Sequence, residues 1–168
     1  MKFKEYYLDE ASEFKIYVDM DGVLSDFEKA IDGVDPKHKY KEVTNWPDKE
    51  FWAHVAKGGL PFWADMKWTK DGKQLWKYVK QFNPTILSAP ARTIPDSKKG
   101  KMIWIKREVN NNPVILARAK DKQKYANDKS ILIDDLKKNI DQWKSSGGIG
   151  ILHKNTADTI KKLKEIMG

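Results

Sequence analysis

The chain has 168 residues and a formal net charge of +8; 40% of its residues are hydrophobic, seven are tryptophan and none is cysteine. These totals fit one folded core and exclude disulfides and thiolate metal sites. The positive charge is compatible with an anionic partner, but lysines are scattered through most of the expected helices, which favours solvated faces. No apolar run approaches the roughly 20 residues that span a bilayer, and residues 1–13 lack the apolar stretch of a secretory signal, so we expect a cytoplasmic protein.

Five short apolar runs predict β-strands that are buried on both faces, because none shows the strict alternation of a half-exposed strand. These runs cover residues 14–18, 85–87, 114–116, 131–133 and 149–152. Apolar residues at helical spacing predict helices over residues 98–109, 136–146 and 156–167. In the first helix the expected buried stripe consists of Met102, Ile105 and Val109. Strands that alternate with helices predict right-handed βαβ units and an α/β fold with a parallel five-stranded sheet.

Residues 27–79 interrupt this alternation. The segment contains no convincing strand, is rich in Trp and Phe, and is too aromatic for a flexible linker. We therefore expect a small helical insertion, residues 27–79, after the first strand. Residues 14–26 and 80–168 would then form the core, and residues 1–13 an N-terminal extension.

Two of the expected strands end in pairs of acidic residues. The first strand runs into Asp19 and Asp21, and the fourth runs into Asp134 and Asp135. In open α/β sheets, ligands bind beyond the carboxyl ends of the strands, near the point where the strand order reverses. Four carboxylates gathered there would repel one another, and a hard divalent cation with oxygen ligands relieves that repulsion. The pattern predicts a Mg²⁺ site.

Each acidic pair also has a purely structural explanation. An Asp-x-Asp-Gly segment such as 19–22 is often a turn or a calcium loop, and Asp134 with Asp135 could cap the following helix. The joint position of both pairs at the ends of separate apolar strands favours chemistry. A third strand end carries Ser88, whose hydroxyl, together with backbone N–H groups, could hold phosphate oxygens, although serine is also an ordinary turn residue.

These segments resemble the haloacid dehalogenase-like (HAD) phosphatase superfamily, and within it the 5'(3')-deoxyribonucleotidase group and related short phage and bacterial nucleotidase-like proteins. Residues 19–27, 86–90 and 131–135 are similar to three of the motifs of that group, and the resemblance covers residues 14–152. It implies a Rossmann-like core with a cap, a hydrolase that removes phosphate from monoesters, and a bacterial or phage origin.

The resemblance implies separate roles for the acids. Asp19 would be the nucleophile that forms an aspartyl-phosphate, and Asp21 the general acid and base. Mg²⁺ would be bound by the Asp19 side chain, the backbone carbonyl of Asp21, and the pair Asp134 and Asp135.

The resemblance also implies phosphate ligands and a lysine. Ser88 and the N–H group of Ala89 would bind the phosphoryl oxygens. The lysine that balances the negative charge would be Lys122, from its Asp-Lys context, or Lys124, whose distance from the acidic pair fits comparably well. Arg92 could contact phosphate or sugar, or form a surface salt bridge.

An aromatic cap suits a nucleobase, because aromatic rings stack on the flat face of a base. The expected cap residues for substrate contact are Trp46, Phe51, Trp52, Phe62 and Trp63. For each ring taken singly, a place in the core of the cap is the favoured alternative, although we expect at least one ring of the set to contact the substrate. The sequence thus predicts dephosphorylation of nucleoside monophosphates. The alternatives are another small phosphomonoester, a 3'-phosphate end of nucleic acid, or a non-enzymatic phospho-accepting or nucleic-acid-binding domain; a nucleic-acid partner is not the favoured reading, and no membrane partner is expected.

Overall fold

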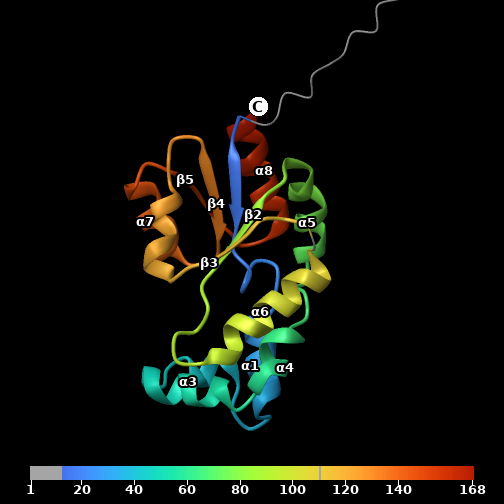
Figure 1. Cartoon of the computed structure of the whole chain (residues 1–168), viewed down its shortest axis with the longest axis vertical. Coiled ribbons are helices and arrows are strands. Elements are labelled where there is room, and N and C mark those ends of the chain that lie inside the picture. The colour runs from blue at the N-terminus through green and yellow to red at the C-terminus, as the bar shows by residue number, and fades with distance from the viewer. Residues whose placement is uncertain (1–12, 110) are drawn as a thin grey trace, which may run out of the picture.

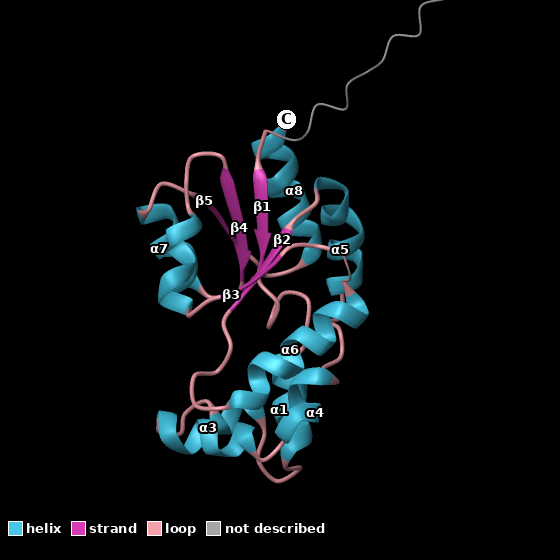
Figure 2. Ribbon diagram, viewed as in Figure 1, coloured by secondary structure: helices cyan, strands magenta, loops and turns pink. Residues whose placement is uncertain are grey.

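The computed structural model describes residues 13–109 and 111–168. In this part of the chain five parallel strands form one sheet in the order β3–β2–β1–β4–β5, which confirms the predicted α/β fold (Figures 1 and 2). The strands are β1 (Lys15–Val18), β2 (Thr85–Ser88), β3 (Val114–Leu116), β4 (Ser130–Asp134) and β5 (Ile149–Leu152). The strand order reverses between β1 and β4, so a ligand site is expected where these two strands end.

The central strands are buried on both faces, which explains their uninterrupted apolar sequences. Ile16 and Val18 of β1 belong to the larger core cluster, whereas Tyr17 between them belongs to a second cluster on the other side of the sheet. In the second cluster the ring of Tyr17 packs edge-on against Trp143, with 5.2 Å between centroids. Both faces therefore gain stability from apolar burial, and neither reaches water.

Helices cover both faces of the sheet. α7 (Lys137–Ser145) packs on β4 and β5 on one side, and α8 (Thr156–Met167) lies on the other side, next to α5 (Gly72–Val79) (Figure 1). Asp71, just before α5, accepts a hydrogen bond of 2.7 Å from the backbone N–H of Thr156 at the start of α8. Helix α5 thus packs with the core, although it falls inside the segment 27–79 that was expected to form the cap.

The cap consists of four short helices that lie beyond the carboxyl end of β1 (Figure 2). They are α1 (Phe27–Val34), α2 (Tyr40–Val43), α3 (Asp48–Ala56) and α4 (Gly59–Ala64). The side chain of Asp26 accepts a 3.0 Å hydrogen bond from the N–H of Lys29 and so caps α1 directly after the first acidic loop. The first acidic loop, residues 19–26, is therefore the whole connection between β1 and the cap.

Helix α6 (Pro95–Glu108) joins the core to the cap. It begins at Pro95, earlier than predicted, because proline is well tolerated in the first turn of a helix. It packs closely on α4 at Gly100, where an added Cβ would lie 2.3 Å from the Cβ of Trp63. The expected buried stripe was partly wrong: Met102 is 41% exposed, and the buried face includes Gly100, Lys101 and Trp104. Contact with α4 thus decides which face of α6 is buried.

The expected N-terminal extension, 1–13, lies outside the described residues except for Glu13, which pairs with Lys129. None of the helices in the described ranges has the length and apolar character that a membrane span requires.

Candidate active site

The loop after β1 turns back tightly on itself. The carbonyl of Met20 accepts a 2.9 Å hydrogen bond from the N–H of Ser25. The turn depends on Gly22, whose φ of +77° lies in the left-handed region that favours glycine. A Cβ at Gly22 would lie 2.1 Å from Oδ2 of Asp135. Glycine therefore lets the first acidic loop approach the second acidic pair.

A buried lysine links the two acidic strand ends. The Nζ of Lys122, in the 3₁₀ segment η2 (Ala119–Tyr125), lies 3.0 Å from Asp19 Oδ1 and 2.8 Å from Asp134 Oδ2. Burial alone would lower the pKa of Lys122, but attraction to Asp19 and Asp134 outweighs it and raises the pKa. Lys124 instead pairs with Asp121 at 2.9 Å, and its side chain is 69% exposed. Of the two candidate lysines, Lys122 is the one that reaches the acids.

The second acidic pair divides into a buried and a pocket-facing carboxylate. Asp134 is fully buried and accepts hydrogen bonds of 2.9 Å from Asn139 Nδ2 and from the N–H of Leu136, so it also ties down the start of α7. Asp135 faces the pocket. Burial, with repulsion from Asp19 and Asp134, raises the pKa of Asp135 to about 8. The capping alternative is wrong: Leu136 is the N-cap residue of α7, and no side chain caps the helix there.

Three carboxylates at the strand ends fit a divalent cation. Asp19, Asp134 and Asp135 each offer an oxygen, and these atoms lie within 4.8 Å of one another. Burial is the main cause that raises the pKa of Asp19 to about 7, despite the opposing attraction of Lys122. One lysine therefore does not neutralise the cluster, and hard oxygen ligands at this spacing suit Mg²⁺. The side chain of Asp21 lies outside this set, and the expectation for its backbone carbonyl stays a prediction.

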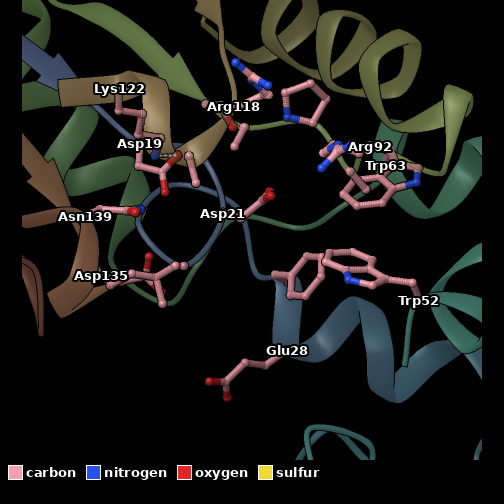
Figure 3. Close-up of a pocket in the computed structure, with 18 of the residues that line it drawn as sticks. Asp19, Asp21, Glu28, Trp52, Trp63, Arg92, Arg118, Lys122, Asp135 and Asn139 are labelled. Atoms are coloured by element: carbon pink, nitrogen blue, oxygen red, sulfur yellow. Dashed lines mark ion pairs between the residues drawn. The ribbon is translucent and has the colours of Figure 1, made fainter. Parts of the chain in front are cut away.

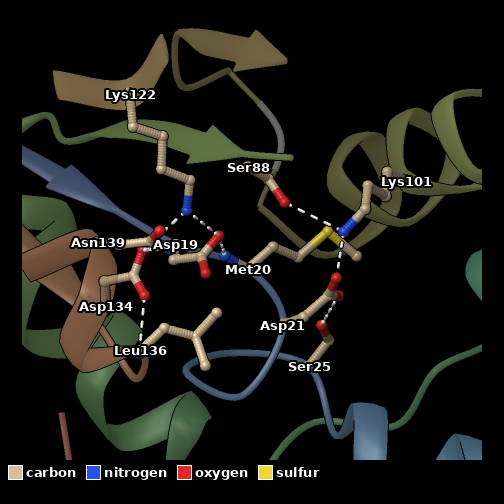
Figure 4. A network of polar contacts seen from close by, with 10 residues as sticks. All are labelled: Asp19, Met20, Asp21, Ser25, Ser88, Lys101, Lys122, Asp134, Leu136 and Asn139. Atoms are coloured by element: carbon tan, nitrogen blue, oxygen red, sulfur yellow. Dashed lines mark hydrogen bonds and ion pairs between the residues drawn. The ribbon is translucent and has the colours of Figure 1, made fainter. Parts of the chain in front are cut away.

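Asp21 has a different partner, Lys101 of α6 (Figure 4). Lys101 is fully buried; its Nζ donates to the Asp21 carboxylate and, over 3.1 Å, to Ser88 Oγ. The same Nζ lies 5.4 Å from the ring centroid of Trp63. The hydroxyl of Ser25 donates to Asp21 Oδ1 over 3.0 Å. The two acids of the first loop thus occupy separate environments, each with its own buried lysine.

The sequence reading missed Lys101. It sits in a lysine-rich stretch with Lys98 and Lys99, which indicates a solvated helix face. A signal was present, however: Ser97, Lys101, Trp104 and Ile105 are spaced along one helical face, and all are buried. A lysine in register with tryptophan and isoleucine is a candidate for a functional buried charge.

Replacement of Lys101 by Met should lower the rate of any reaction catalysed at this site by about 10- to 10³-fold, because charged hydrogen bonds at Asp21 and Ser88 are lost while the apolar stem is kept. The matched control is Lys124→Met, which removes an exposed lysine and should change activity less than about twofold. Steady-state rates, with circular dichroism to check folding, measure both. Equal rates for Lys101→Met and the parent protein would show that Lys101 does not contribute to catalysis.

The acids open into a pocket of about 980 Å³ between the strand ends and the cap (Figure 3). Six residues predicted for catalysis or phosphate binding line it: Asp19, Asp21, Lys122, Ser88, Ala89 and Arg92. The cap contributes three of its expected aromatic residues: Phe51, Trp52 and Trp63. The pocket thus joins the acidic site to an aromatic wall.

Two expected substrate residues lie elsewhere. Trp46 packs between His38 and His54, with ring centroids 5.1 and 5.4 Å away, and is not part of the pocket lining. Phe62 packs against the ring of Phe27 at 5.5 Å and borders a separate, smaller hollow. For these two residues the expectation was wrong: they form the core of the cap, as its small size requires.

The pocket also contains residues that the sequence reading did not select. They include Phe27, Glu28, Tyr40, Arg118 and Asn139. Burial, followed by the negative charge of Glu28 and Asp135, raises the pKa of Tyr40, so its hydroxyl keeps its proton. Phe27 and Glu28 come directly after the first acidic loop, and that position was the available signal.

No protein-family model matches the chain, and no curated protein matches it either. Solved structures do share its fold. A hydrolase from Streptococcus pneumoniae TIGR4 superposes with a TM-score of 0.55 at 12% identity, covering 90% of this chain and 99% of that one. A HAD-superfamily hydrolase from Ehrlichia chaffeensis gives 0.54 at 10% identity, covering 92% and 97%. L-2-haloacid dehalogenase from Xanthobacter autotrophicus gives 0.54 at 10% identity, covering 89% and 82%. The predicted HAD-like fold is confirmed; identities this low speak for the fold alone.

Proposed function

We propose that the protein is a Mg²⁺-dependent phosphomonoesterase that works through an aspartyl-phosphate and acts on nucleoside monophosphates. The observation that carries the proposal is the separation of the two acids of the first loop. Asp19 shares Lys122 with Asp134, whereas Asp21 and Ser88 share Lys101. Two carboxylates in different environments can act as nucleophile and as proton donor in one reaction.

The chemistry takes two steps. Asp19 attacks phosphorus, the bond from phosphorus to the leaving oxygen breaks, and Asp21 gives its proton to that oxygen. Water then attacks the aspartyl-phosphate, Asp21 accepts a proton from the water, the bond to Asp19 breaks, and inorganic phosphate leaves. Asp19, Asp134 and Asp135 would hold Mg²⁺, which supplies positive charge against the phosphate.

The two buried lysines complement these steps. Lys122 stays charged and holds the Asp19 carboxylate in place. Lys101 lies between Asp21 and Ser88, so it can transfer its hydrogen bond from Asp21 to a phosphoryl oxygen when substrate binds. Such a transfer would free the Asp21 carboxyl group for proton exchange with the leaving oxygen.

The aromatic wall supports a nucleotide substrate. Trp52, Phe51 and Phe27 line the cap side of the pocket, while the acids lie at the strand ends. Stacking of a base on such rings is worth about 1–3 kcal/mol. A pocket of about 980 Å³ has room for a nucleoside as well as its phosphate.

A substrate panel tests the proposal. Phosphate release should require Mg²⁺ and should be faster for nucleoside monophosphates than for sugar phosphates of equal charge. Trp52→Leu tests the aromatic wall and should raise KM for nucleotides. Trp46→Leu, outside the pocket, is the matched control and should leave KM unchanged. Turnover of sugar phosphates with nucleotides left untouched would refute the nucleotide part, and no release from any monoester would refute the whole.

Mg²⁺ affinity should rise with pH between about 6 and 8.5. The pKa values of Asp19 and Asp135, raised to about 7 and about 8, mean that both carboxylates hold protons at the lower pH. Below the pKa of a carboxyl group, the metal must displace its proton, and each such proton weakens Mg²⁺ binding by up to about tenfold for every unit by which the pH falls.

The same raised pKa values determine how the stability of the metal-free protein changes with pH. An acid whose pKa is raised in the folded state binds protons more tightly there than in the unfolded state, so metal-free stability should fall as pH rises from about 4 through 8. Thermal melts at pH 6 and pH 8.5 without Mg²⁺ measure the change in metal-free stability. The same melts with Mg²⁺ measure how strongly the metal stabilises the fold at each pH. A Mg²⁺-induced rise in Tm that is as large at pH 6 as at pH 8.5 would contradict it.

A further inference from the structure

Two arginines line the pocket in addition to the buried lysines of the site, whose charges are already paired with acids. Lys101 and Lys122 already lie beside the reacting acids, where the transferred phosphate would sit. Arg92, in the loop after β2, and Arg118, directly before η2, line the same pocket. Neither arginine contacts the acids that carry the proposed reaction, so both are available for another group.

Arg92 is an exposed arginine without a fixed partner. No hydrogen bond or ion pair holds its guanidinium to any residue in the described part of the chain. A free arginine at a pocket wall keeps all its donors for a ligand, and its planar group suits two oxygens of a phosphate.

An ion pair holds Arg118 in position but leaves some of its hydrogen-bond donors unoccupied. Its Nε donates to Asp121 Oδ2 over 2.6 Å, and hydrogen bonds from Arg118 and Lys124 lower the pKa of Asp121 to about 2. Asp121 therefore stays ionised and anchors the arginine. Within the described residues this bond occupies Nε alone and leaves the terminal Nη groups able to donate.

The two arginines lie on one side of the pocket. Figure 3 shows Arg92 and Arg118 on the side away from α1, with Glu28 and Trp52 across the pocket. The acidic groups Asp19 and Asp135 lie at the strand ends. The positive charge is thus local, and an anion bound there would avoid the carboxylate of Glu28.

We propose that Arg92 and Arg118 form a second phosphate site, and that the substrate is a nucleotide unit bearing two phosphoryl groups. One group would be hydrolysed at Asp19, while the other would be held by the arginines. This inference rests on the proposed phosphomonoesterase function and extends its substrate from a nucleoside monophosphate to a nucleotide unit with a second phosphoryl group. The second phosphate can belong to a nucleoside bisphosphate or to the phosphodiester at the end of a nucleic-acid strand.

Three substrates with a common base test this: thymidine 3'-monophosphate, thymidine 3',5'-bisphosphate and a 3'-phosphorylated thymidine dinucleotide. The second phosphate should raise kcat/KM by about 10- to 100-fold, as expected for charge-assisted hydrogen bonds from two arginines. The double variant Arg92→Gln with Arg118→Gln should lose that preference. Arg107→Gln, which removes an exposed arginine on α6, should keep it. A preference for the bisphosphate or for the dinucleotide shows whether the second phosphate comes from a nucleoside bisphosphate or from a nucleic-acid end.

Binding separates this inference from the proposed function. Calorimetry with the Asp19→Asn variant measures affinity for the same three ligands without turnover. Tighter binding of the two-phosphate ligands, lost in the Arg92→Gln and Arg118→Gln background, supports the second site even if no ligand is hydrolysed. Equal affinity for one and two phosphates would overturn it, even where monophosphates are hydrolysed normally.

Discussion

Replacement of Asp19 by Asn should reduce phosphate release by on the order of 10⁴-fold or more, because no other group would form the phosphoryl-enzyme. Asn keeps the size of the side chain and can still accept a hydrogen bond from Lys122. The matched control is Asp141→Asn, an exposed position on α7, which should leave the rate within about twofold. Steady-state phosphate release measures both variants.

The stability of the Asp19→Asn variant should move in the opposite direction to its activity. Burial raises the pKa of Asp19 to about 7, so its ionised form disfavours the metal-free folded state at pH 8. Asn removes that charge, and the metal-free Tm at pH 8 should therefore equal or exceed that of the parent. A variant that is inactive only because it is unfolded would show a lower Tm, and an active variant would exclude Asp19 as the nucleophile.

Replacement of Asp21 by Asn should slow turnover by about 10²- to 10⁴-fold, the usual contribution of general acid–base catalysis. The choice of substrate separates its two roles. A leaving group as good as p-nitrophenolate needs no proton, so the first step should persist while hydrolysis of the aspartyl-phosphate slows. The expected result is a burst of nitrophenolate followed by a slow steady state.

The control for this experiment is Asp26→Asn, in the same loop. Asn also caps helices well, so α1 should be kept and the rate changed far less. A normal steady-state rate for Asp21→Asn, or loss of the first step as well with the activated substrate, would exclude the proposed role of Asp21.

The sheet and the acidic cluster could be predicted because each follows from a local pattern. The five strands are apolar on both faces, as Ile16, Tyr17 and Val18 illustrate, and such runs are visible without tertiary information. The acids directly follow two of these strands, and parallel strands bring their carboxyl ends to one edge. The position of Asp19 and Asp134 at the ends of apolar strands, together with the parallel topology, was therefore enough to predict that the two acids lie close together.

The remaining parts of the site depend on contacts between distant segments. Lys101 is buried because α6 packs on α4; its spacing with Trp104 and Ile105 indicates a buried face, but not which helix covers it. Arg118 reaches the pocket because η2 also carries Lys122 to the acids. Trp46 and Phe62 were expected at the substrate, but aromatic content alone does not tell the core of a small cap from its inner wall.

Mass spectrometry of acid-quenched enzyme tests the central claim most directly. The protein is mixed with Mg²⁺ and substrate, quenched within the burst, digested and searched for a phosphorylated peptide. The Asp21→Asn variant, in which hydrolysis of the intermediate should be slow, serves as the source with the highest yield. We predict one phosphoryl group on the peptide that contains Asp19, lost when Asp19 is replaced by Asn. A phosphoryl group on another residue, or steady turnover with no phosphoryl-enzyme at any time, would contradict the account.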